Sequence, residues 1–309
     1  MMTPTGKNTV RTAGSAAFQS PVFLLLVTGV LFGFNFPLGK IAGDAGISPV
    51  LWAMIVSGGV CVMLLPVLVI RRRLEIPKGR MIRYVIISAL ISFVIPNILL
   101  FSVIPRAGSG YTGIMFALSP VFTLALAALF RLKTPGWIGV IGIVTGLIGA
   151  TIVSITRGVA PEAPAAIWII AAMVIPMVLA CGNIYRTMDW PDGALPDVLA
   201  FWSHGFSVVV FIALLLVTTG TVPLIELSQA PVSALAQAIV AGLTFPIYFR
   251  LQQQGGPVLL SQISYVAAAI GLIAATVLLG ERYGTMTWAG AAIIAVGIAI
   301  TIVAQTTRR

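Results

Sequence analysis

The stretch FGFNFPLGK, residues 32 to 40, places polar groups inside an otherwise apolar run and is the first candidate for binding chemistry. Pro37 removes a backbone hydrogen bond and is expected to bend a helix there. Polar groups inside a membrane are costly unless they are paired or face water. Asn35 either caps carbonyls released by the bend or faces a substrate path. Lys40 either reaches the outer membrane interface or binds a substrate.

Other polar side chains recur at helical spacing further along the chain. Gln237, Thr244, Tyr248 and Gln252 follow one another at steps of seven, four and four residues, which places them on one helix face. Such a row either lines a cavity or makes hydrogen bonds between helices. The predicted substrate-binding candidates are Asn35, Lys40, Asn97, Tyr111, Asn183, Thr244, Tyr248, Gln252, Gln262 and Tyr265.

The residue types needed for catalysis or for a metal site are scarce. The chain has one histidine, His204, and two separated cysteines, and no clustered metal ligands are expected. A nucleophile paired with a base is not apparent either, so we expect no catalytic residue and no cofactor. All eight acidic residues fall in loops or at the ends of predicted helices. This favours facilitated diffusion or exchange over obligate proton antiport.

The composition favours lipid as the solvent of this chain. Of 309 residues, 59% are hydrophobic and 8% are charged, and the mean hydropathy is +1.08. Soluble proteins carry about 25% charged residues. Apolar stretches of about 20 residues can cross a bilayer as helices. Ten such helices are predicted, at 21–43, 48–70, 83–104, 108–130, 135–156, 165–187, 197–219, 232–252, 257–279 and 286–305.

The basic residues predict the orientation of these helices. With the N-terminus in the cytoplasm, 14 of the 18 lysines and arginines fall on the cytoplasmic side, among them Arg186 at a helix end. The basic cluster at residues 71–83 flanks membrane helices, which suits contact with lipid headgroups and not with nucleic acid. We therefore expect a multi-pass protein of the inner or plasma membrane with both termini in the cytoplasm.

The chain repeats itself at an interval of about 150 residues. Trp137 matches Trp288, and Asn35 matches Asn183 at a slightly shorter offset. Because five helices per unit is an odd number, the second unit must enter the membrane from the opposite side. Inverted repeats of this kind are a transporter architecture. We expect an all-α integral membrane protein with a cytoplasmic tail and two inverted five-helix repeats, at 1–20, 21–156 and 165–305.

Three stretches carry a family resemblance: FGFNFPLGK, PRAGSGYTGIMFALSPVFTLALAALF and LLGERYGTMTWAGAAIIAVGIAITIVA. Together they resemble the ten-helix EamA-type branch of the drug/metabolite transporter superfamily, over about residues 21 to 305. The resemblance implies ten helices, a central cavity lined by helices 1, 3, 4, 6, 8 and 9, and export as the default direction. The glutamate typical of the turn after the ninth helix is present as Glu281, but its counterpart in the first half is Phe130. No transport role is assigned to it.

The candidate lining residues restrict the substrate class. They are amides, tyrosines, hydroxyls and aromatics, with Lys40 as the one cation considered and no buried carboxylate. A neutral or zwitterionic amphipathic solute is favoured, such as an amino acid or an aromatic metabolite. A sugar-phosphate or nucleotide-sugar exchanger that uses Lys40 is the alternative carrier, and a channel or lipid-moving protein is the other alternative. The glycine-rich helices at 135–156 and 286–305 are interpreted as scaffold and are compatible with a homodimer face.

Overall fold

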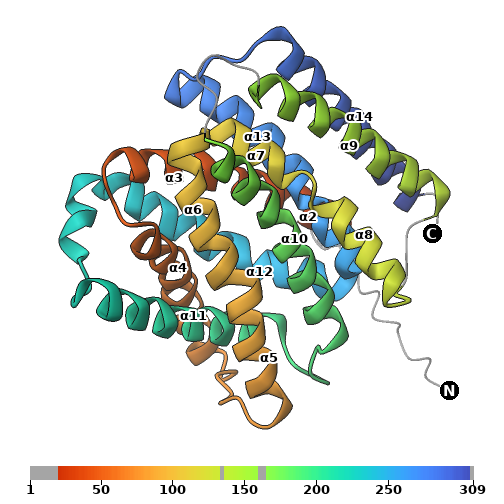
Figure 1. Ribbon diagram of the computed structural model, residues 1–309. Coiled ribbons are helices and arrows are strands. Elements are labelled where there is room, and N and C mark those ends of the chain that lie inside the picture. Colours follow the sequence, from red (N-terminus) through yellow and green to blue (C-terminus); the bar gives the residue numbers. More distant parts are fainter. Residues whose placement is uncertain (1–19, 133–135, 159–164, 307–309) are drawn as a thin grey trace, which may run out of the picture.

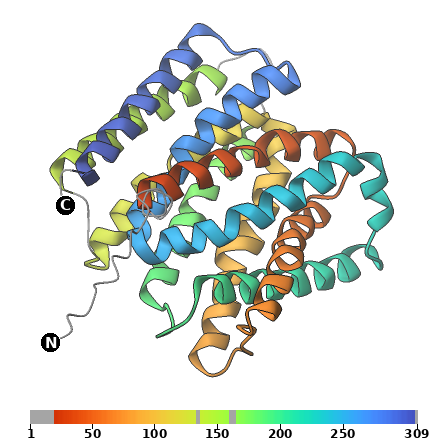
Figure 2. The same cartoon turned by 180° about the vertical axis from the view of Figure 1, so that it is seen from behind.

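The computed structural model describes residues 20–132, 136–158 and 165–306. Every regular element in these ranges is a helix (Figure 1, Figure 2). Within these ranges, seven helical spans are long and apolar enough to cross a membrane, and three further apolar helices accompany them. The all-α prediction is therefore confirmed for the described part of the chain. The predicted N-terminal tail lies, apart from residue 20, outside these ranges.

The helices follow one another along the chain with short connections. The first half contains α2 (Pro21–Gly33), α3 (Asn35–Asp44), α4 (Pro49–Ile70), α5 (Arg80–Ser88), the π-helix η1 (Ala89–Val94), α6 (Ile95–Ala107), α7 (Ser109–Phe116), α8 (Ser119–Leu129) and α9 (Trp137–Gly158). The second half contains α10 (Ala166–Met188), α11 (Pro196–Thr219), the 3₁₀-helix η2 (Leu224–Gln229), α12 (Pro231–Ser261), α13 (Ile263–Leu279) and α14 (Thr285–Thr306). Proline at the first or second position begins six of them. Its missing N–H is one that a first turn leaves without a partner.

Prolines also explain why several predicted helices are not continuous. The predicted helix over 21–43 is broken at Phe34, because Pro37 has no N–H for the carbonyl of Gly33 and its ring crowds that carbonyl. The predicted helix over 108–130 is interrupted in the same way between Phe116 and Ser119, just ahead of Pro120. Within the predicted helix over 83–104, the π-helix η1 precedes Pro96.

The predicted helices over 232–252 and 257–279 also differ from the structure. Gly256 has a φ of +69°, a left-handed conformation that suits glycine, and it precedes Pro257, which disfavours helix in the residue before it. The bounds of α12 run across this kink to Ser261. A second interruption at Gln262 separates α12 from α13. The predicted ninth helix is therefore built from two pieces.

Helices from the two halves of the chain pair with each other. α9 packs along α14 on one side of the molecule, and α4 packs against α11 on the opposite side (Figure 1). The central helices lie between these two pairs, among them α2, α6, α7, α10, α12 and α13 (Figure 1, Figure 2). Gly149 faces the Gly290 carbonyl, and Gly297 faces the Gly142 carbonyl, so α9 and α14 approach closely. These glycines therefore pack helices of the same chain against each other. A homodimer formed through the glycine-rich helices stays a prediction.

Two adjacent glycines of α4 test the close packing of α4 on α12. A Cβ at Gly59 would lie 2.6 Å from the Cα of Ala238, whereas a Cβ at Gly58 would meet nothing within 4 Å. We expect Gly59→Ala to lower the free energy of unfolding by about 1–3 kcal/mol, because overpacking displaces neighbouring backbone. Gly58→Ala should leave it unchanged or raise it, since alanine favours helix. Thermal unfolding of both variants in detergent gives the comparison, and equal midpoints would contradict this packing.

Candidate functional site

A pocket lies between the central helices and encloses about 530 Å³ of empty space, part of it open to solvent. Its lining comes from the first, third, fourth, sixth, eighth and ninth predicted spans, which are the six that the family resemblance implies. The lining residues are Phe32, Ser92, Phe93, Pro96, Asn97, Leu100, Phe116, Ser119, Ile175, Leu179, Asn183, Phe245, Tyr248, Leu260, Ser261, Ile263 and Ser264.

Aromatic rings form much of the apolar wall. Phe32 stacks on Phe116 with 5.1 Å between the ring centroids, and Phe93 meets Phe245 edge to face at 5.5 Å. The four rings come from α2, α7, η1 and α12, so helices far apart in the sequence meet at this wall. Rings of this kind present faces to the apolar or aromatic part of a small molecule.

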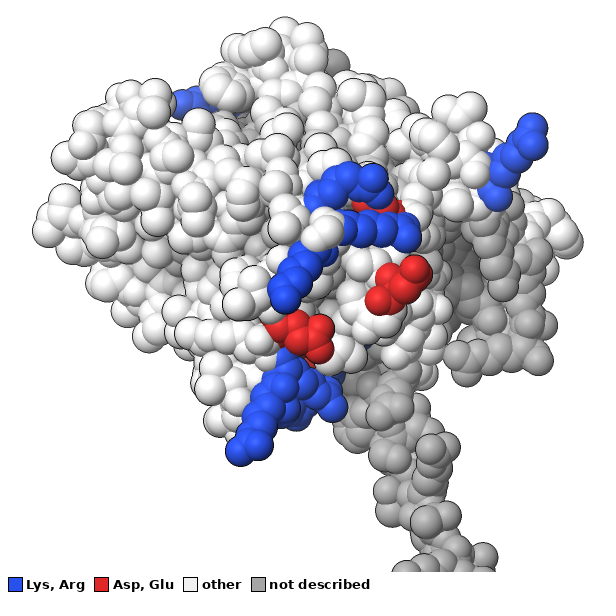
Figure 3. Space-filling view, turned by 90° about the horizontal axis from the view of Figure 1, so that it is seen from below, with Lys and Arg blue, Asp and Glu red and all other residues white. Residues whose placement is uncertain are grey.

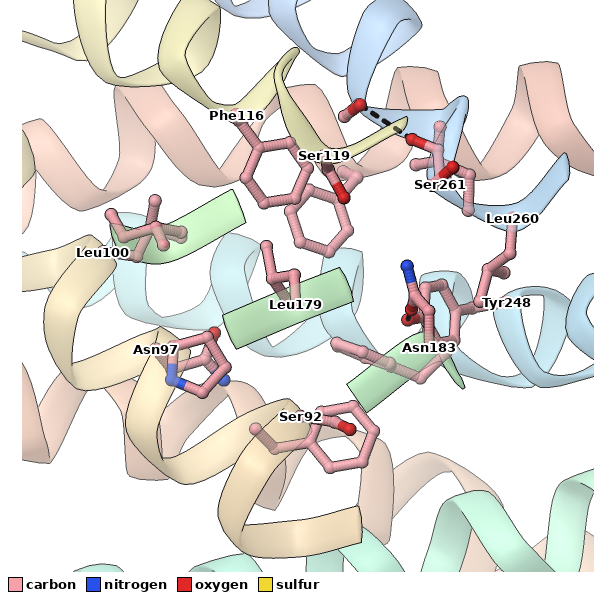
Figure 4. Close-up of a pocket in the computed structure, with 17 residues that line it drawn as sticks. Ser92, Asn97, Leu100, Phe116, Ser119, Leu179, Asn183, Tyr248, Leu260 and Ser261 are labelled. Atoms are coloured by element: carbon pink, nitrogen blue, oxygen red, sulfur yellow. Dashed lines mark hydrogen bonds between the residues drawn. The ribbon is translucent and has the colours of Figure 1, made fainter. Parts of the chain in front are cut away.

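Polar groups stand on two sides of this apolar lining. Figure 4 shows Ser92 and Asn97 on one side of the pocket and Asn183 and Tyr248 on the other. The Ser92 hydroxyl and the Asn97 Nδ2 group are buried and make no hydrogen bond with any described residue. Because a buried polar group without a partner is unfavourable, these two groups are available to hydrogen-bond a bound solute.

A buried arginine, Arg186, lies behind Asn183 and Tyr248. Its side chain has no exposed surface. The Nε group donates to the Gln252 Oε1 atom at 2.7 Å, and Nη2 donates to the Asn183 Oδ1 atom at 2.9 Å and to the Tyr248 hydroxyl. The Nη1 group has no hydrogen-bond partner among the described residues. The Cζ atom lies 5.4 Å from the ring centroid of Phe93, which also lines the pocket.

The prediction from sequence omitted Arg186 as a site residue. Because Arg186 lies near the end of the predicted helix, we counted it among the charges that face water. In the structure α10 continues to Met188, and the Arg186 side chain is fully buried. A signal was present, because Asn183 and Arg186 are three residues apart and share a helix face. Tyr248 and Gln252 are four apart and share another. Two such polar pairs on helix faces, one of which contains a cation, indicate a buried hydrogen-bond network more than a charge exposed in a loop.

Two of the residues first singled out lie outside the pocket lining. Asn35 donates its Nδ2 group to the Phe32 carbonyl at 2.8 Å and accepts a hydrogen bond from Gln237 at 2.7 Å. It therefore caps a carbonyl at the helix break and ties α3 to α12, which corresponds to the capping interpretation. Lys40 forms an ion pair with Asp44 one turn along α3 and is partly exposed. The bend at this stretch is present, but its polar groups bond locally.

The remaining candidates divide between the pocket and the surrounding packing. The structure brings Asn97, Asn183 and Tyr248 together in the lining, with Gln252 beside them through Arg186. Elsewhere, Tyr111 lines a smaller pocket next to the α13–α14 loop, and Thr244 donates to a carbonyl of its own helix. Gln262 is buried at the α12–α13 break, and the Tyr265 hydroxyl donates to a carbonyl of α9.

His204 lies directly behind the aromatic wall. Its ring is 4.2 Å from both Phe93 and Phe245, between centroids, and its Nδ1 atom is 3.1 Å from the Ser57 hydroxyl. It comes from α11, outside the six lining spans, and supports the wall from behind. The described residues contain no group of three or more His, Cys, Asp or Glu placed to hold a metal ion.

An ion-pair network joins α5 to the end of α10. Asp189 accepts from the Arg83 Nη2 group at 2.6 Å, the Arg80 Nε group at 3.0 Å and the Tyr185 hydroxyl at 2.7 Å. Burial acts to raise the pKa of Asp189, but the hydrogen bonds from Arg83, Tyr185 and Arg80 outweigh it and lower the pKa to about 2. Figure 3 shows the face that carries α5, where basic side chains gather with acidic ones among them.

A second network joins the α13–α14 loop to α7. Glu281 accepts from the backbone N–H groups of Ser109 at 3.1 Å and Gly110 at 3.4 Å, and from the Tyr283 hydroxyl. A carboxylate at this position satisfies N–H groups that the first turn of a helix leaves unpaired and complements the helix dipole. Glu281, for which the sequence analysis assigned no transport role, therefore links the first and second halves of the chain at this end.

Comparison with known proteins agrees with this geometry. A sequence model of the EamA-like transporter family matches residues 19–155 and again residues 165–303. A solved crystal structure, 17% identical in sequence, covers 93% of this chain and 98% of its own with a TM-score of 0.66, which shows the same fold. No curated protein sequence is detectably similar to the chain. Since the family model matches both halves, nearly end to end, this multi-pass membrane protein belongs to the EamA-like transporter family.

Proposed function

We propose that this protein is a secondary transporter that exports a small amphipathic metabolite, such as an amino acid or an aromatic compound. The observation that carries the proposal is the central pocket, whose walls come from both halves of the chain and combine aromatic rings with a few polar groups. Small-molecule sites are mostly apolar with a small number of placed polar groups. Export is the direction that the family resemblance implies.

The proposed mechanism is alternating access between two inverted five-helix repeats. The ten predicted spans at residues 21–156 and 165–305 would form these repeats, with both termini in the cytoplasm of an inner or plasma membrane. The pairing of α4 with α11 and of α9 with α14 supports this arrangement, because corresponding helices of the two halves lie together. Rocking of one half against the other would open the pocket to each side in turn.

Two networks are positioned to act as the closures in this mechanism. In the proposed orientation the Asp189 network joins α5 and α10 at the cytoplasmic end of the pocket. The Glu281 network joins α7 and the α13–α14 loop at the outer end. Each joins segments whose separation would admit solute from its side, so we propose that they open alternately.

The proposed energetics are facilitated diffusion or exchange. The described lining residues are apolar, hydroxyl or amide side chains, and proton-driven carriers commonly use ionisable groups within the membrane. A sugar-phosphate or nucleotide-sugar exchanger is less well supported, since Lys40 is paired with Asp44 and lies outside the pocket lining.

Counterflow in proteoliposomes tests the transport function. A thermal-shift screen with L-phenylalanine, phenethylamine, tetraphenylphosphonium, glucose 6-phosphate and UDP-glucose selects the probe, because a ligand of the folded state raises its stability. Liposomes loaded with that probe should accumulate labelled probe transiently and saturably. Uptake that rises linearly with concentration, without counterflow, would point to a channel, and uptake equal to that of empty liposomes would contradict the proposal.

A pocket-filling substitution ties transport to this site. Leu179 and Ile170 lie on the same helix, α10; Leu179 lines the pocket, whereas Ile170 is 57% exposed on the outer surface. We expect Leu179→Trp to reduce the counterflow rate by about tenfold or more, because the indole ring takes the space that a solute needs. Ile170→Trp, the matched control, should transport normally. Equal rates for the two variants would place the path elsewhere.

Substituting Lys40 separates the two carrier hypotheses. Lys40→Ala removes an ion pair at the end of α3 that is partly exposed and therefore contributes little. We expect the counterflow rate of the selected probe to stay within roughly twofold of the wild-type rate. Abolished exchange in this variant, with glucose 6-phosphate as the preferred probe, would instead favour the sugar-phosphate exchanger.

The pH dependence of stability reports on the cytoplasmic closure. The pKa of Asp189 is about 2 in the folded chain against an ordinary value of 3.8. A carboxylate with a lowered folded pKa stabilises the fold above its unfolded pKa, and this contribution is lost as the pH falls through the folded pKa. The wild-type thermal midpoint should therefore drop between about pH 4 and pH 2 by more than that of Asp189→Asn.

The matched control for this measurement is Asp192→Asn. The side chain of Asp192 is fully exposed, and its nearest cation, Arg80, is 3.8 Å away. This variant should therefore follow the wild-type curve. If Asp189→Asn also follows it, Asp189 does not couple α5 to α10 in the way described.

A further inference from the structure

Arg186 carries a positive charge that no described carboxylate neutralises. The ion pairs of the described residues use Lys40, Arg80, Arg83 and Arg250 as cations. The acceptors of Arg186, by contrast, are an amide of Gln252, an amide of Asn183 and a phenol of Tyr248, all uncharged. A buried cation without a counter-ion lowers stability, and ionisable residues inside a membrane protein mark functional sites.

The guanidinium of Arg186 lies against the pocket and not at a remote point in the core. Asn183 and Tyr248, which accept its hydrogen bonds, both line the pocket and appear together at one end of it in Figure 4. Phe93, another lining residue, has its ring centroid 5.4 Å from the Cζ atom. The Nη1 group, buried and without a hydrogen-bond partner in the described structure, is a donor still available for an acceptor.

We propose that Arg186 recognises a carboxylate of the transported solute, so that the substrate is a carboxylic acid with an apolar or aromatic body. The inference rests on the proposed transport function. The planar fork of an arginine matches a carboxylate in geometry and charge. The Tyr248 hydroxyl, which now donates to the Asn183 Oδ1 atom at 3.1 Å, can turn to donate to the same carboxylate. The rings of the aromatic wall then hold the body.

The charge count favours a carboxylate over a phosphate ester. A phosphate monoester carries about −1.5 to −2 charges near neutral pH. The basic side chains that could help Arg186 are already occupied: Arg80 and Arg83 bind Asp189, and Lys40 binds Asp44. One buried cation therefore balances one carboxylate. A solute whose only charge is an amine would be repelled by the same group.

A binding role and a structural role for Arg186 predict opposite effects on the ligand-free protein. If the charge serves the fold, its removal lowers stability. If it is held for a ligand, Arg186→Gln removes a buried charge, keeps an amide that can bond to Asn183 and Tyr248, and leaves the thermal midpoint unchanged or raises it. The stability of the ligand-free variant is thus a readout that a purely structural role would move the other way.

The experiment compares ligands that differ only in the charged group. Thermal shift and counterflow are measured with 3-phenylpropionate, L-phenylalanine, 3-phenylpropionamide, phenethylamine and phenyl phosphate. The wild-type protein should be stabilised by the two carboxylates and not by the amide or the amine. In Arg186→Gln their affinity should fall by at least roughly 30-fold, as for loss of one partner of a buried charge pair. Arg106→Gln, at an exposed helix end, is the matched control and should bind normally.

Each alternative outcome overturns a different statement. If Arg186→Gln binds 3-phenylpropionate as the wild type does, or the wild type binds the amide equally well or prefers phenyl phosphate, the carboxylate assignment fails while counterflow keeps the transport function. If no probe is exchanged, the transport function fails first and the assignment with it. Should Arg186→Gln not fold, Arg186→Lys decides: it keeps the charge without the fork and should bind carboxylates about tenfold more weakly.

Discussion

In a bilayer, a backbone N–H or C=O group that loses its helical partner finds no water to replace it. Irregular backbone is therefore tolerated only where it is covered by protein or lines a cavity. The breaks in this chain follow that constraint closely. Phe116 and Ser119 flank the α7–α8 break, Ser261 and Ile263 flank the α12–α13 break, and all four line the pocket. Part of the pocket wall is therefore formed where two helices are interrupted.

The polar side chains are organised around the same interruptions. Asn35 uses its amide to satisfy a carbonyl next to the α2–α3 break, and Gln237 satisfies the amide in turn. Elsewhere in the described structure, carboxylates satisfy their neighbours: Asp189 binds two arginines, and Glu281 caps α7. Among the charged side chains named here, Arg186 differs in the described structure, because all of its hydrogen-bond partners are neutral. A charge that the fold does not balance is free to be balanced by a ligand.

Helix content, span positions and the division into halves could be predicted from the sequence. A helix that crosses a bilayer needs about 20 apolar residues, and such stretches are visible in the hydropathy of the sequence. Continuity of the helices does not follow, since a proline fixes where hydrogen bonds are lost but not whether the chain bends or breaks. The site was only partly predictable. Asn97, Asn183 and Tyr248 reach the pocket, but Asn35, at a matching repeat position, bonds to backbone instead. The rotation of each helix about its axis decides this, and residue type does not encode that rotation.

The two halves of the chain resemble each other in helix order but not in charge. At the offset that aligns Asn35 with Asn183, the counterpart of Arg186 is Leu38. At the slightly longer offset that aligns Trp137 with Trp288, the counterpart of Glu281 is Phe130. The cation and the capping carboxylate therefore belong to the second half alone. A pocket built by near-symmetric halves would bind a solute in two equivalent orientations. Under the proposal that Arg186 binds a carboxylate, the cationic end and the aromatic wall beside it would hold an amphipathic acid in a single orientation, with its carboxylate toward α10 and α12.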